Sequence, residues 1–336
     1  MKLLVTGGAG FIGSAFVRLL LSDPDARHSV TVLDKLTYAG NLDNLAPVSG
    51  RPGYRFVQGD ITDSVLLSDL LAQSRPDAIV HFAAESHVDR SILSPEPVFE
   101  TNLRGTFALL EAVRAHGIAR YVHISTDEVY GSIEAPYEAD ETWPLRASSP
   151  YSATKAGSDL LALSYHTTYK CPVIVTRASN NYGSYQFPEK LIPLMISNAL
   201  EDKPLPIYGD GLQVRDWLYV DDHCRAILAV LERGVEGEIY NIGGSRSLPN
   251  REVVLKILAL TGKPESLMTR VTDRPGHDRR YALSSEKITR ATGWAPQVPF
   301  EDGLAATIQW YKDNAEWVRR VKSGEYHEYY QANYTR

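Results

Sequence analysis

The chain has 336 residues, of which 43% are hydrophobic and 23% are charged, and its formal net charge is −6. This composition is ordinary for a globular protein, and the length predicts either one large domain or two lobes around a cleft. A negative net charge argues against nucleic-acid and membrane-surface binding, because both favour a basic surface.

The cysteines and the N-terminus exclude further classes. Cys171 and Cys224 have no partner at metal-ligand spacing, so we expect neither a disulfide framework nor a metal site. The apolar run near Met1 stops at Thr6, which is too short for a signal peptide, and no run of about 18 apolar residues is present. We therefore expect a cytoplasmic protein without a membrane span.

A glycine-rich turn joins a short apolar strand, Lys2 to Thr6, to a helical pattern over Ser14 to Leu21. Gly7 permits a tight turn, Gly10 lets a pyrophosphate approach the backbone, and Gly13 lets the helix pack on the strand. The pyrophosphate would then lie against the N–H groups at the start of the helix. The order of strand, glycines and helix predicts a dinucleotide site.

The next strand, Ser29 to Leu33, ends in Asp34, about 20 residues after the last of these glycines. A carboxylate here hydrogen-bonds a ribose 2′-hydroxyl and repels a 2′-phosphate, so NAD is favoured over NADP. Lys35 weakens this preference slightly. The alternative is that Asp34 is only a turn residue.

Strands and helices then alternate along the chain. Strand-like runs cover Tyr54 to Val57, Ala78 to Phe82 and Tyr121 to Ser125, with helical patterns over Ser64–Gln73 and Asn102–His116. This alternation predicts a doubly wound parallel α/β sheet of the Rossmann type.

Two acids follow the strand that ends at Ser125. Burying the charges of Asp127 and Glu128 costs free energy unless they are paired, so their presence here suggests either a partner or a function. Ligands of open α/β folds bind beyond the carboxyl ends of the strands, which is where this pair lies. The alternative is a loop with an acidic helix cap.

Tyr151 and Lys155 are four residues apart, and thus on one face of the helix predicted after Pro150. A free tyrosine has a pKa of about 10 and is a poor base near neutral pH. A neighbouring ammonium is expected to lower that pKa. Ser125 or Thr126 could supply a hydroxyl to the same substrate oxygen. This spacing also occurs by chance, so a structural role is the alternative.

Several motifs together carry a resemblance. The segments TGGAGFIG, HFAAESHVDRS, STDEVYG, SPYSATKAGSD and NNYGSYQFPEKLIP resemble the extended short-chain dehydrogenase/reductase family and, within it, the dTDP-glucose 4,6-dehydratases. The resemblance runs from Met1 to about Tyr311. Thr126-Asp127-Glu128 discriminates best, because related 4-epimerases usually lack the acid pair and decarboxylases usually carry Ser-Glu. Ser184 departs from the proline that is common in the family.

The resemblance implies an NAD-dependent lyase that acts on a nucleotide sugar. Tyr151 would remove the C4 hydroxyl proton, Glu128 would be the C5 base and Asp127 the acid at C6. Thr126 would polarise the C4 oxygen, and Lys155 would assist the tyrosine. One base and one acid on neighbouring carbons require different pKa values, which different surroundings can provide.

The resemblance also implies the binding residues. The cofactor contacts are Gly7, Gly10, Phe11, Ile12, Gly13, Asp34, Lys35, Thr37, Asp60, Ile61, Phe82, Ala83, Ala84, Ser86, Thr101, Tyr151, Lys155 and Asn181. Of these, Asp60 could instead cap a helix. The substrate contacts are Ser86, Thr126, Asn180, Lys190, Leu191, Pro206, Tyr208, Arg215, Asn250, Arg274 and His277. Two arginines further on, at positions 279 and 280, could equally be surface residues.

The predicted architecture is a cofactor domain over residues 1–180, with segments that return around 212–242, and a smaller α/β substrate lobe over 181–336. In the lobe we expect a strand and turn from Leu205 and helices from Pro188 and Asn250, while a helix from Val220 returns to the core of the cofactor domain. The family usually forms homodimers, here through Asn102–His116 and Ser152–Tyr169. A sibling epimerase or decarboxylase and an inactive NAD-binding regulator are the alternatives. The choice between thymine and uracil, and the role of the tyrosine-rich tail around 326–334, stay open.

Overall fold

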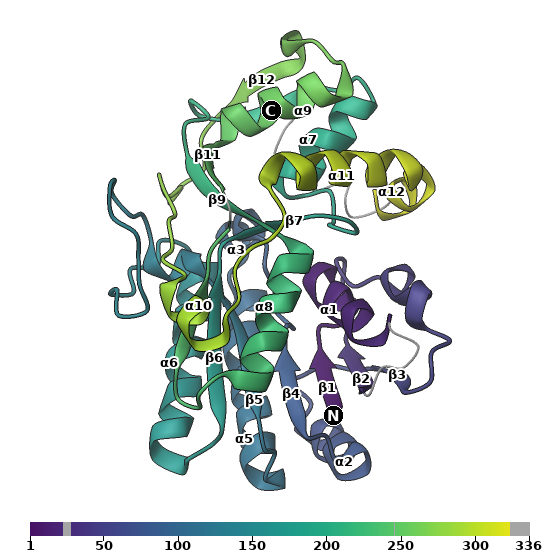
Figure 1. Ribbon diagram of the computed structural model, residues 1–336, viewed down its shortest axis with the longest axis vertical. Coiled ribbons are helices and arrows are strands. Elements are labelled where there is room, and N and C mark those ends of the chain that lie inside the picture. Colours follow the sequence, from purple (N-terminus) through teal and green to yellow (C-terminus); the bar gives the residue numbers. More distant parts are fainter. Residues whose placement is uncertain (23–27, 245, 323–336) are drawn as a thin grey trace.

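The computed structural model describes residues 1–22, 28–244 and 246–322 (Figure 1). The tyrosine-rich tail around residues 326–334 lies outside the described residues. Two layers of helices enclose a central sheet, and a smaller group of helices and strands sits beyond one end of that sheet.

Seven parallel strands form the central sheet in the order β10-β6-β5-β4-β1-β2-β3. They are β1 (Lys2–Thr6), β2 (Ser29–Asp34), β3 (Tyr54–Gln58), β4 (Ala78–His81), β5 (Tyr121–Thr126), β6 (Val173–Ala178) and β10 (Ile239–Ile242). The predicted doubly wound parallel sheet is confirmed. The strand order reverses between β1 and β4, where Thr6 pairs with Leu33 on one side and with His81 on the other. Such a reversal opens a crevice at the carboxyl ends of the strands.

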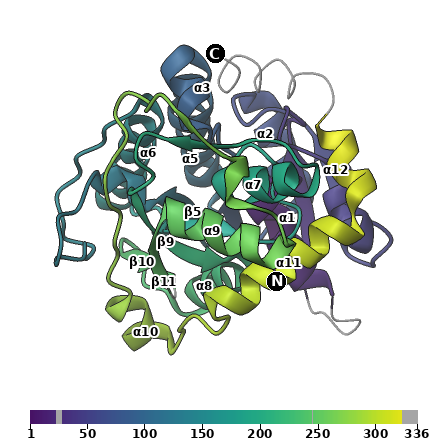
Figure 2. The ribbon, with the colours of Figure 1, turned by 90° about the horizontal axis from the view of Figure 1, so that it is seen from above.

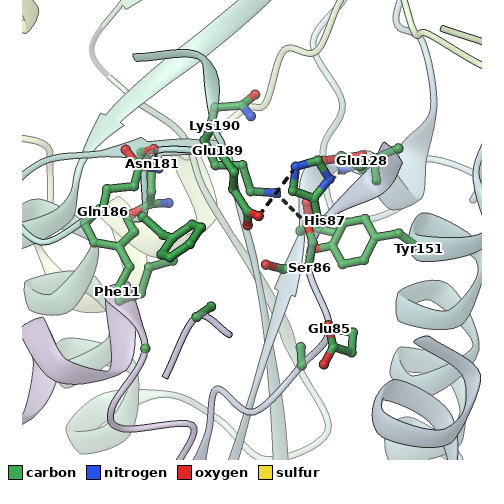
Figure 3. Close-up of a pocket in the computed structure, with 18 of the residues that line it drawn as sticks. Phe11, Glu85, Ser86, His87, Glu128, Tyr151, Asn181, Gln186, Glu189 and Lys190 are labelled. Atoms are coloured by element: carbon green, nitrogen blue, oxygen red, sulfur yellow. Dashed lines mark hydrogen bonds and ion pairs between the residues drawn. The ribbon is translucent and has the colours of Figure 1, made fainter. Parts of the chain in front are cut away.

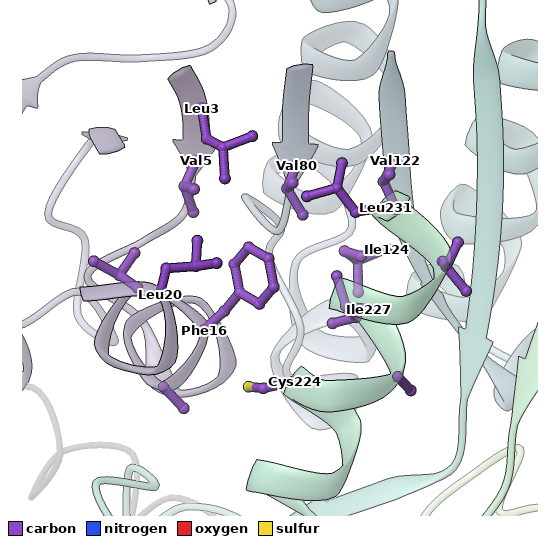
Figure 4. Close-up of a cluster of buried hydrophobic side chains, with 14 of the residues drawn as sticks. Leu3, Val5, Phe16, Leu20, Val80, Val122, Ile124, Cys224, Ile227 and Leu231 are labelled. Atoms are coloured by element: carbon purple, nitrogen blue, oxygen red, sulfur yellow. The ribbon is translucent and has the colours of Figure 1, made fainter. Parts of the chain in front are cut away.

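Alternating side chains attach helices to both faces of the sheet. Leu3 and Val5 of β1 pack with Phe16 and Ile227 against α1 (Phe11–Leu21) and α8 (Val220–Arg233), as Figure 4 shows. Leu4, which points to the opposite face, joins the core beneath three other helices. These are α2 (Ser64–Ser74), α5 (Thr106–His116) and α6 (Pro150–Tyr169).

Two predicted helix starts in the cofactor domain are wrong. Helix α1 begins at Phe11 rather than Ser14, because Gly10 is its N-cap. The predicted helix from Asn102 is a π-helical segment, η2 (Phe99–Gly105), followed by α5. In the wide turn Asn102 exchanges two hydrogen bonds with the backbone of Glu85, at 2.9 and 3.0 Å. Helical periodicity alone does not reveal such an insertion, which is frequent at functional sites.

The smaller lobe has its own core. Its strands are β7 (Asn180–Tyr182), β9 (Val214–Tyr219) and β11 (Arg246–Pro249) in one sheet, and β8 (Leu205–Tyr208) with β12 (Met268–Val271) in another. Its helices are α7 (Leu191–Leu200), α9 (Asn250–Thr261), α11 (Phe300–Asp313) and α12 (Ala315–Val321). Seen from above, α7, α9 and α11 lie over the end of the central sheet (Figure 2).

The expectations for this lobe are largely confirmed. The strand from Leu205 and the helix from Asn250 are present, and the helix from Val220 returns to pack on the central sheet. The helix expected from Pro188 begins at Leu191 instead, with Lys190 as its N-cap. A lysine side chain at that position is free to turn away from the helix.

Candidate active site

One pocket lies between the carboxyl ends of the central strands and the smaller lobe, and every residue predicted for the site lines it. On the side of the central sheet these are Gly7, Gly10, Phe11, Ile12, Gly13, Asp34, Lys35, Thr37, Asp60, Ile61, Phe82, Ala83, Ala84, Ser86 and Thr101. Towards the lobe they are Asn180, Asn181, Lys190, Leu191, Pro206, Tyr208, Arg215, Asn250, Arg274 and His277. Thr126, Asp127, Glu128, Tyr151 and Lys155 lie between the two groups along the chain and line the same pocket.

The glycine turn forms a cradle that side chains would fill. Gly7 has a φ of +70°, and a Cβ there would lie 2.5 Å from the backbone nitrogen of Ala83. A Cβ on Gly13 would collide with the carbonyl oxygen of Gly7. Helix α1 has no side-chain cap, so its first N–H groups face the pocket end of the sheet without an internal partner. This combination fits the diphosphate of a dinucleotide.

The acids of the cofactor side are held by the backbone. Asp34 accepts hydrogen bonds from the amides of Ala9 and Leu36, at 2.9 and 2.8 Å. Each carboxylate oxygen has two lone pairs, so both can still accept a ribose hydroxyl. Asp60 pairs with Lys35 at 2.7 Å. The helix cap that was its alternative role belongs to Asp63, which caps α2.

Tyr151 and Lys155 project from the first turns of α6. Ser149 and Ser152 form a capping box that fixes the start of this helix, and Lys155 Nζ donates to the carbonyl oxygen of Ile124 at 2.7 Å. Burial lowers the pKa of Lys155 to about 8. Burial, with the Glu128 charge next, raises the pKa of Tyr151, while a hydrogen bond with Thr126 opposes the rise. The predicted lowering of the tyrosine pKa is thus wrong for this structure, because the cost of desolvating a phenolate dominates.

A buried ion network lies behind Lys155. Asp159, one turn further along α6, accepts from Arg177 Nε at 2.8 Å and lies 3.3 Å from His123 Nε2. Its charge raises the pKa of Lys155 against the effect of burial. The sequence analysis missed this aspartate, although its spacing of four from the lysine places the two on one helix face.

The acid pair begins a short 3-10 helix, η3 (Asp127–Tyr130), whose cap is the Thr126 hydroxyl. The alternative of an acidic helix cap is therefore not what the structure shows. Asp127 is buried, and among the described residues its Oδ2 has no hydrogen-bond partner. Burial, and then the Glu128 charge, raises the pKa of Asp127 well above its usual value.

Glu128 lies in different surroundings. It is half-buried, and burial raises its pKa, but Arg274, Lys190 and then Arg215 lower it. The pKa of Glu128 therefore lies above its ordinary value, but it is raised less than that of Asp127, which is biased further towards the protonated form. This is the separation that an acid and a base on neighbouring carbons require.

The cationic side chains of the lobe each contact a partner within the protein. Lys190 Nζ donates to the Ser86 carbonyl oxygen at 2.6 Å, and the Arg215 guanidinium lies 4.2 Å from the ring centre of Tyr281. Arg274 Nη1 pairs with Asp89 at 2.9 Å. The other two arginines lie outside this pocket, since Arg279 pairs with Asp210 and Arg280 donates to backbone carbonyls.

Several lining residues were missed by the sequence analysis, notably His87, Asp89, Gln186, Glu189 and His223. Figure 3 shows His87 and Glu189 facing each other, with 3.6 Å between Nε2 and Oε2. The Tyr38 hydroxyl donates to the other oxygen of Glu189 at 3.2 Å. His223 lies 2.9 Å from the side-chain oxygen of Asn181. His87 and Glu189 stand next to Ser86 and Lys190, which were predicted, whereas the other three have no predicted site residue as a neighbour in the sequence.

Over the described ranges 1–22, 28–244 and 246–322, the helices are all too short or too polar to cross a membrane. The same ranges hold no group of three or more histidine, cysteine or acidic side chains placed to bind a metal ion.

Fold and site together define an extended short-chain dehydrogenase/reductase, with its dinucleotide cradle and its tyrosine–lysine pair. The family model for GDP-mannose 4,6 dehydratase matches residues 4–307. The chain is 52% identical to the dTDP-glucose 4,6-dehydratase of Shigella flexneri over 99% of both chains.

Solved structures agree. The dTDP-glucose 4,6-dehydratase of Streptomyces venezuelae, crystallised with NAD, is 54% identical over 96% of this chain and 100% of its own, with a TM-score of 0.93. The UDP-glucose 4-epimerase of Thermus thermophilus, also with NAD, is 34% identical over 94% of this chain and 100% of its own, with a TM-score of 0.86. The chain belongs to the family of the dTDP-glucose 4,6-dehydratases.

Proposed function

We propose that this protein is an NAD-dependent hydro-lyase that converts dTDP-glucose into dTDP-4-keto-6-deoxyglucose. The observation that carries the proposal is the acid pair Asp127–Glu128, which lines the same pocket as Tyr151 and Lys155. A tyrosine–lysine pair alone serves oxidation at C4. The additional acid and base are what the removal of water between C5 and C6 requires.

The residues of the cradle fit NAD. The diphosphate would lie over Gly7, Gly10 and Gly13 at the start of α1, and Asp34 would hold the adenosine ribose. When bound, this cofactor accepts the C4 hydride of the sugar and returns it to C6. The net reaction is redox-neutral, so we expect the cofactor to stay bound throughout the turnover.

Tyr151 is the C4 base in this proposal. Its hydroxyl hydrogen-bonds with Thr126, so both can contact the same sugar oxygen. The tyrosine needs help to lose its proton, because burial and Glu128 raise its pKa. A protonated Lys155 on the same helix face supplies positive charge for the phenolate, and Asp159 favours that protonated form.

The acid pair then performs the elimination. A ketone at C4 acidifies the C5 proton, and Glu128 removes it as a carboxylate; burial raises the pKa of Glu128, but three nearby cations limit that rise. Asp127, whose pKa burial raises, donates a proton to the departing C6 hydroxyl. Glu128 then returns its proton to C5, which restores its carboxylate, and the proton that Tyr151 took from the C4 hydroxyl balances the one that Asp127 gave to the departing water.

The lobe supplies the nucleotide contacts. Arg215 and Arg274 would hold the diphosphate, for which arginine is better suited than lysine. Lys190 would approach the same charges, with Asn250 and His277 near the nucleoside. The buried side-chain oxygen of Asn250 has no hydrogen-bond partner among the described residues, which is consistent with a ligand contact.

The test is the mass of the product. Incubated with dTDP-glucose, the protein should give a product lighter by one water, and UDP-glucose should give less of it. A product of unchanged mass but altered C4 configuration would indicate the sibling epimerase instead, and loss of carbon dioxide from a uronic acid would indicate a decarboxylase. An inactive regulator would form no product, although Tyr151 and Lys155 are both present.

We also propose a division into a cofactor domain over 1–180, with returning segments around 212–242, and a substrate lobe mainly over 181–336.

We propose further that the protein is a homodimer. An apolar groove on η2, α5 and α6 supports the dimer, with Phe99, Phe107 and Leu160 exposed by 51%, 47% and 58%. Sedimentation should give the mass of two chains, and Leu160→Asp should shift it to one.

A further inference from the structure

An aspartate that no step of the reaction uses connects the two halves of the pocket. Asp89 belongs to α3 (Val88–Leu93), just after the loop that follows β4, and its side chain is 8% exposed. Its Oδ1 accepts from Arg274 Nη1 at 2.9 Å, and its Oδ2 accepts from the Tyr208 hydroxyl at 2.9 Å. One carboxylate therefore fixes two side chains that line the pocket.

Both partners come from the lobe. Tyr208 ends β8, and Arg274 follows shortly after β12, its parallel neighbour. The loop that carries Arg274 is organised by a second aspartate, since Asp273 lies 2.6 Å from His277 Nδ1 and accepts from Gln213 at 3.0 Å. The first aspartate sets the orientation of this loop relative to the central sheet.

Arg274 is held by one nitrogen and has donors to spare. Its side chain is 20% exposed, and its buried Nε has no hydrogen-bond partner among the described residues. The guanidinium is a rigid fork of five donors, so fixing Nη1 fixes the direction of the others. A buried donor without a partner is costly, because its lost hydration is not replaced. Such an arrangement is expected where a ligand supplies the acceptor.

The charge of Asp89 cannot be what favours the ligand. An anion beside a diphosphate site repels it, and the charge and hydrogen bond of Arg274 keep the pKa of Asp89 below its usual value despite burial. Any benefit of this carboxylate to substrate binding must therefore come from geometry. Charge and geometry predict opposite signs for its removal.

We propose that Asp89 is a positioning residue that orients Arg274 towards the diphosphate of the nucleotide sugar and holds Tyr208 in place beside it. This inference rests on the proposed function, because it takes the diphosphate from there. It adds a residue to the site that contacts no reacting atom and acts through two side chains of the other half.

The experiment measures dTDP binding by calorimetry on the purified protein with its cofactor. Asp89→Asn keeps the size of the side chain, and we expect it to weaken dTDP binding roughly tenfold, in line with the loss of one buried charged pair. KM for dTDP-glucose should rise more than kcat falls. Unchanged or tighter dTDP binding would overturn the proposal, because removal of the charge alone predicts that result.

The matched control is Asp210→Asn, which makes the same chemical change at the exposed Arg279 pair of the same lobe. It should leave dTDP binding unchanged. In an Arg274→Lys background, Asp89→Asn should have a much smaller effect, because the partner it positions is already altered. Equal effects in both backgrounds would contradict positioning through Arg274.

Melting temperature and bound NAD are measured on every variant. If Asp89→Asn loses its cofactor or its fold, the role is structural and the proposal fails for that variant. Asp89→Glu then decides, because it keeps the charge but displaces it by one methylene, and positioning still predicts weaker dTDP binding. A wild-type protein that does not bind dTDP would overturn the proposed function itself, whereas a failure confined to the Asp89 variants overturns only this inference.

Discussion

The two sides of the pocket are built by different means. On the side of the central sheet, backbone groups form most of the binding surface: glycines leave space, helix α1 presents uncapped N–H groups, and Asp34 is held by two amides. On the side of the lobe, charged side chains form that surface, and each contacts a partner, as Arg274 contacts Asp89. The first side should therefore be sensitive to added volume, and the second to changes of charge and orientation.

The largest effect should follow from volume on the cofactor side. Gly7→Ala forces a positive φ on alanine and puts its Cβ 2.5 Å from the backbone of Ala83, so we expect strain of about 1–3 kcal/mol and loss of the cradle. The purified variant should carry no bound NAD and should be inactive. The measurement is the NAD released per chain on denaturation.

Gly50→Ala is the matched control in the same half, since a Cβ there meets nothing within 4 Å. It should retain full NAD and activity. Equal loss in both variants would mean that the cofactor side is not selectively intolerant of volume.

On the substrate side the expected effect is intermediate and spares the cofactor. Arg215→Gln removes a charge that is buried against Tyr281, and dTDP binding should weaken by about ten- to a hundredfold, corresponding to roughly 1.5–3 kcal/mol. NAD content should stay at the wild-type level. Arg279→Gln, at an exposed pair outside this pocket, should change neither quantity, and calorimetry with dTDP checks both variants.

The contrast also explains what the sequence reveals. The cradle, Asp34 and the pair Tyr151–Lys155 follow from short spacings, because strand, turn and helix place those residues together locally. All the predicted residues do line one pocket. Asp89, by contrast, meets Arg274 and Tyr208, which lie 185 and 119 residues further along the chain, and no local pattern marks such a contact.

The pKa values of the buried groups were the second feature that could not be predicted from the sequence. A tyrosine and a lysine four apart suggest a lowered tyrosine pKa, but the structure raises it, because burial and the Glu128 charge come from packing that the spacing does not contain. The prediction of a regular helix from Asn102, where the structure has a π-helical turn, was wrong for a related reason. The cause of the turn is a tertiary contact with the Glu85 backbone rather than its own periodicity.

The smallest effect is expected where the two sides meet. Glu189 contacts Tyr38 and His87, and burial raises its pKa to about 7 from an ordinary 4.5. Because the pKa of this carboxyl is higher in the folded than in the unfolded chain, its contribution to stability is fully present at a pH below the unfolded pKa. That contribution is lost as the pH rises through the folded pKa of about 7. The melting temperature of wild type minus that of Glu189→Gln should therefore fall between pH 5 and 8, on the order of 2–4 °C.

A difference that is independent of pH would show that Glu189 does not titrate in this range. A difference that grows with pH would reverse the sign and place its pKa below the ordinary value. Thermal unfolding in a series of buffers at constant ionic strength distinguishes these outcomes.

In the proposed mechanism Tyr151 and Lys155 serve the oxidation of C4 to a ketone, and Asp127 and Glu128 determine whether water is then eliminated. The most direct measurement is a single turnover of Glu128→Gln with dTDP-glucose, followed both by the absorbance of reduced nicotinamide and by product mass. We predict that the absorbance appears and persists, while no product lighter by one water forms, because C4 is oxidised but C5 keeps its proton. Formation of the dehydrated product at the wild-type rate would contradict the assignment of Glu128 and, with it, the division of labour within the site.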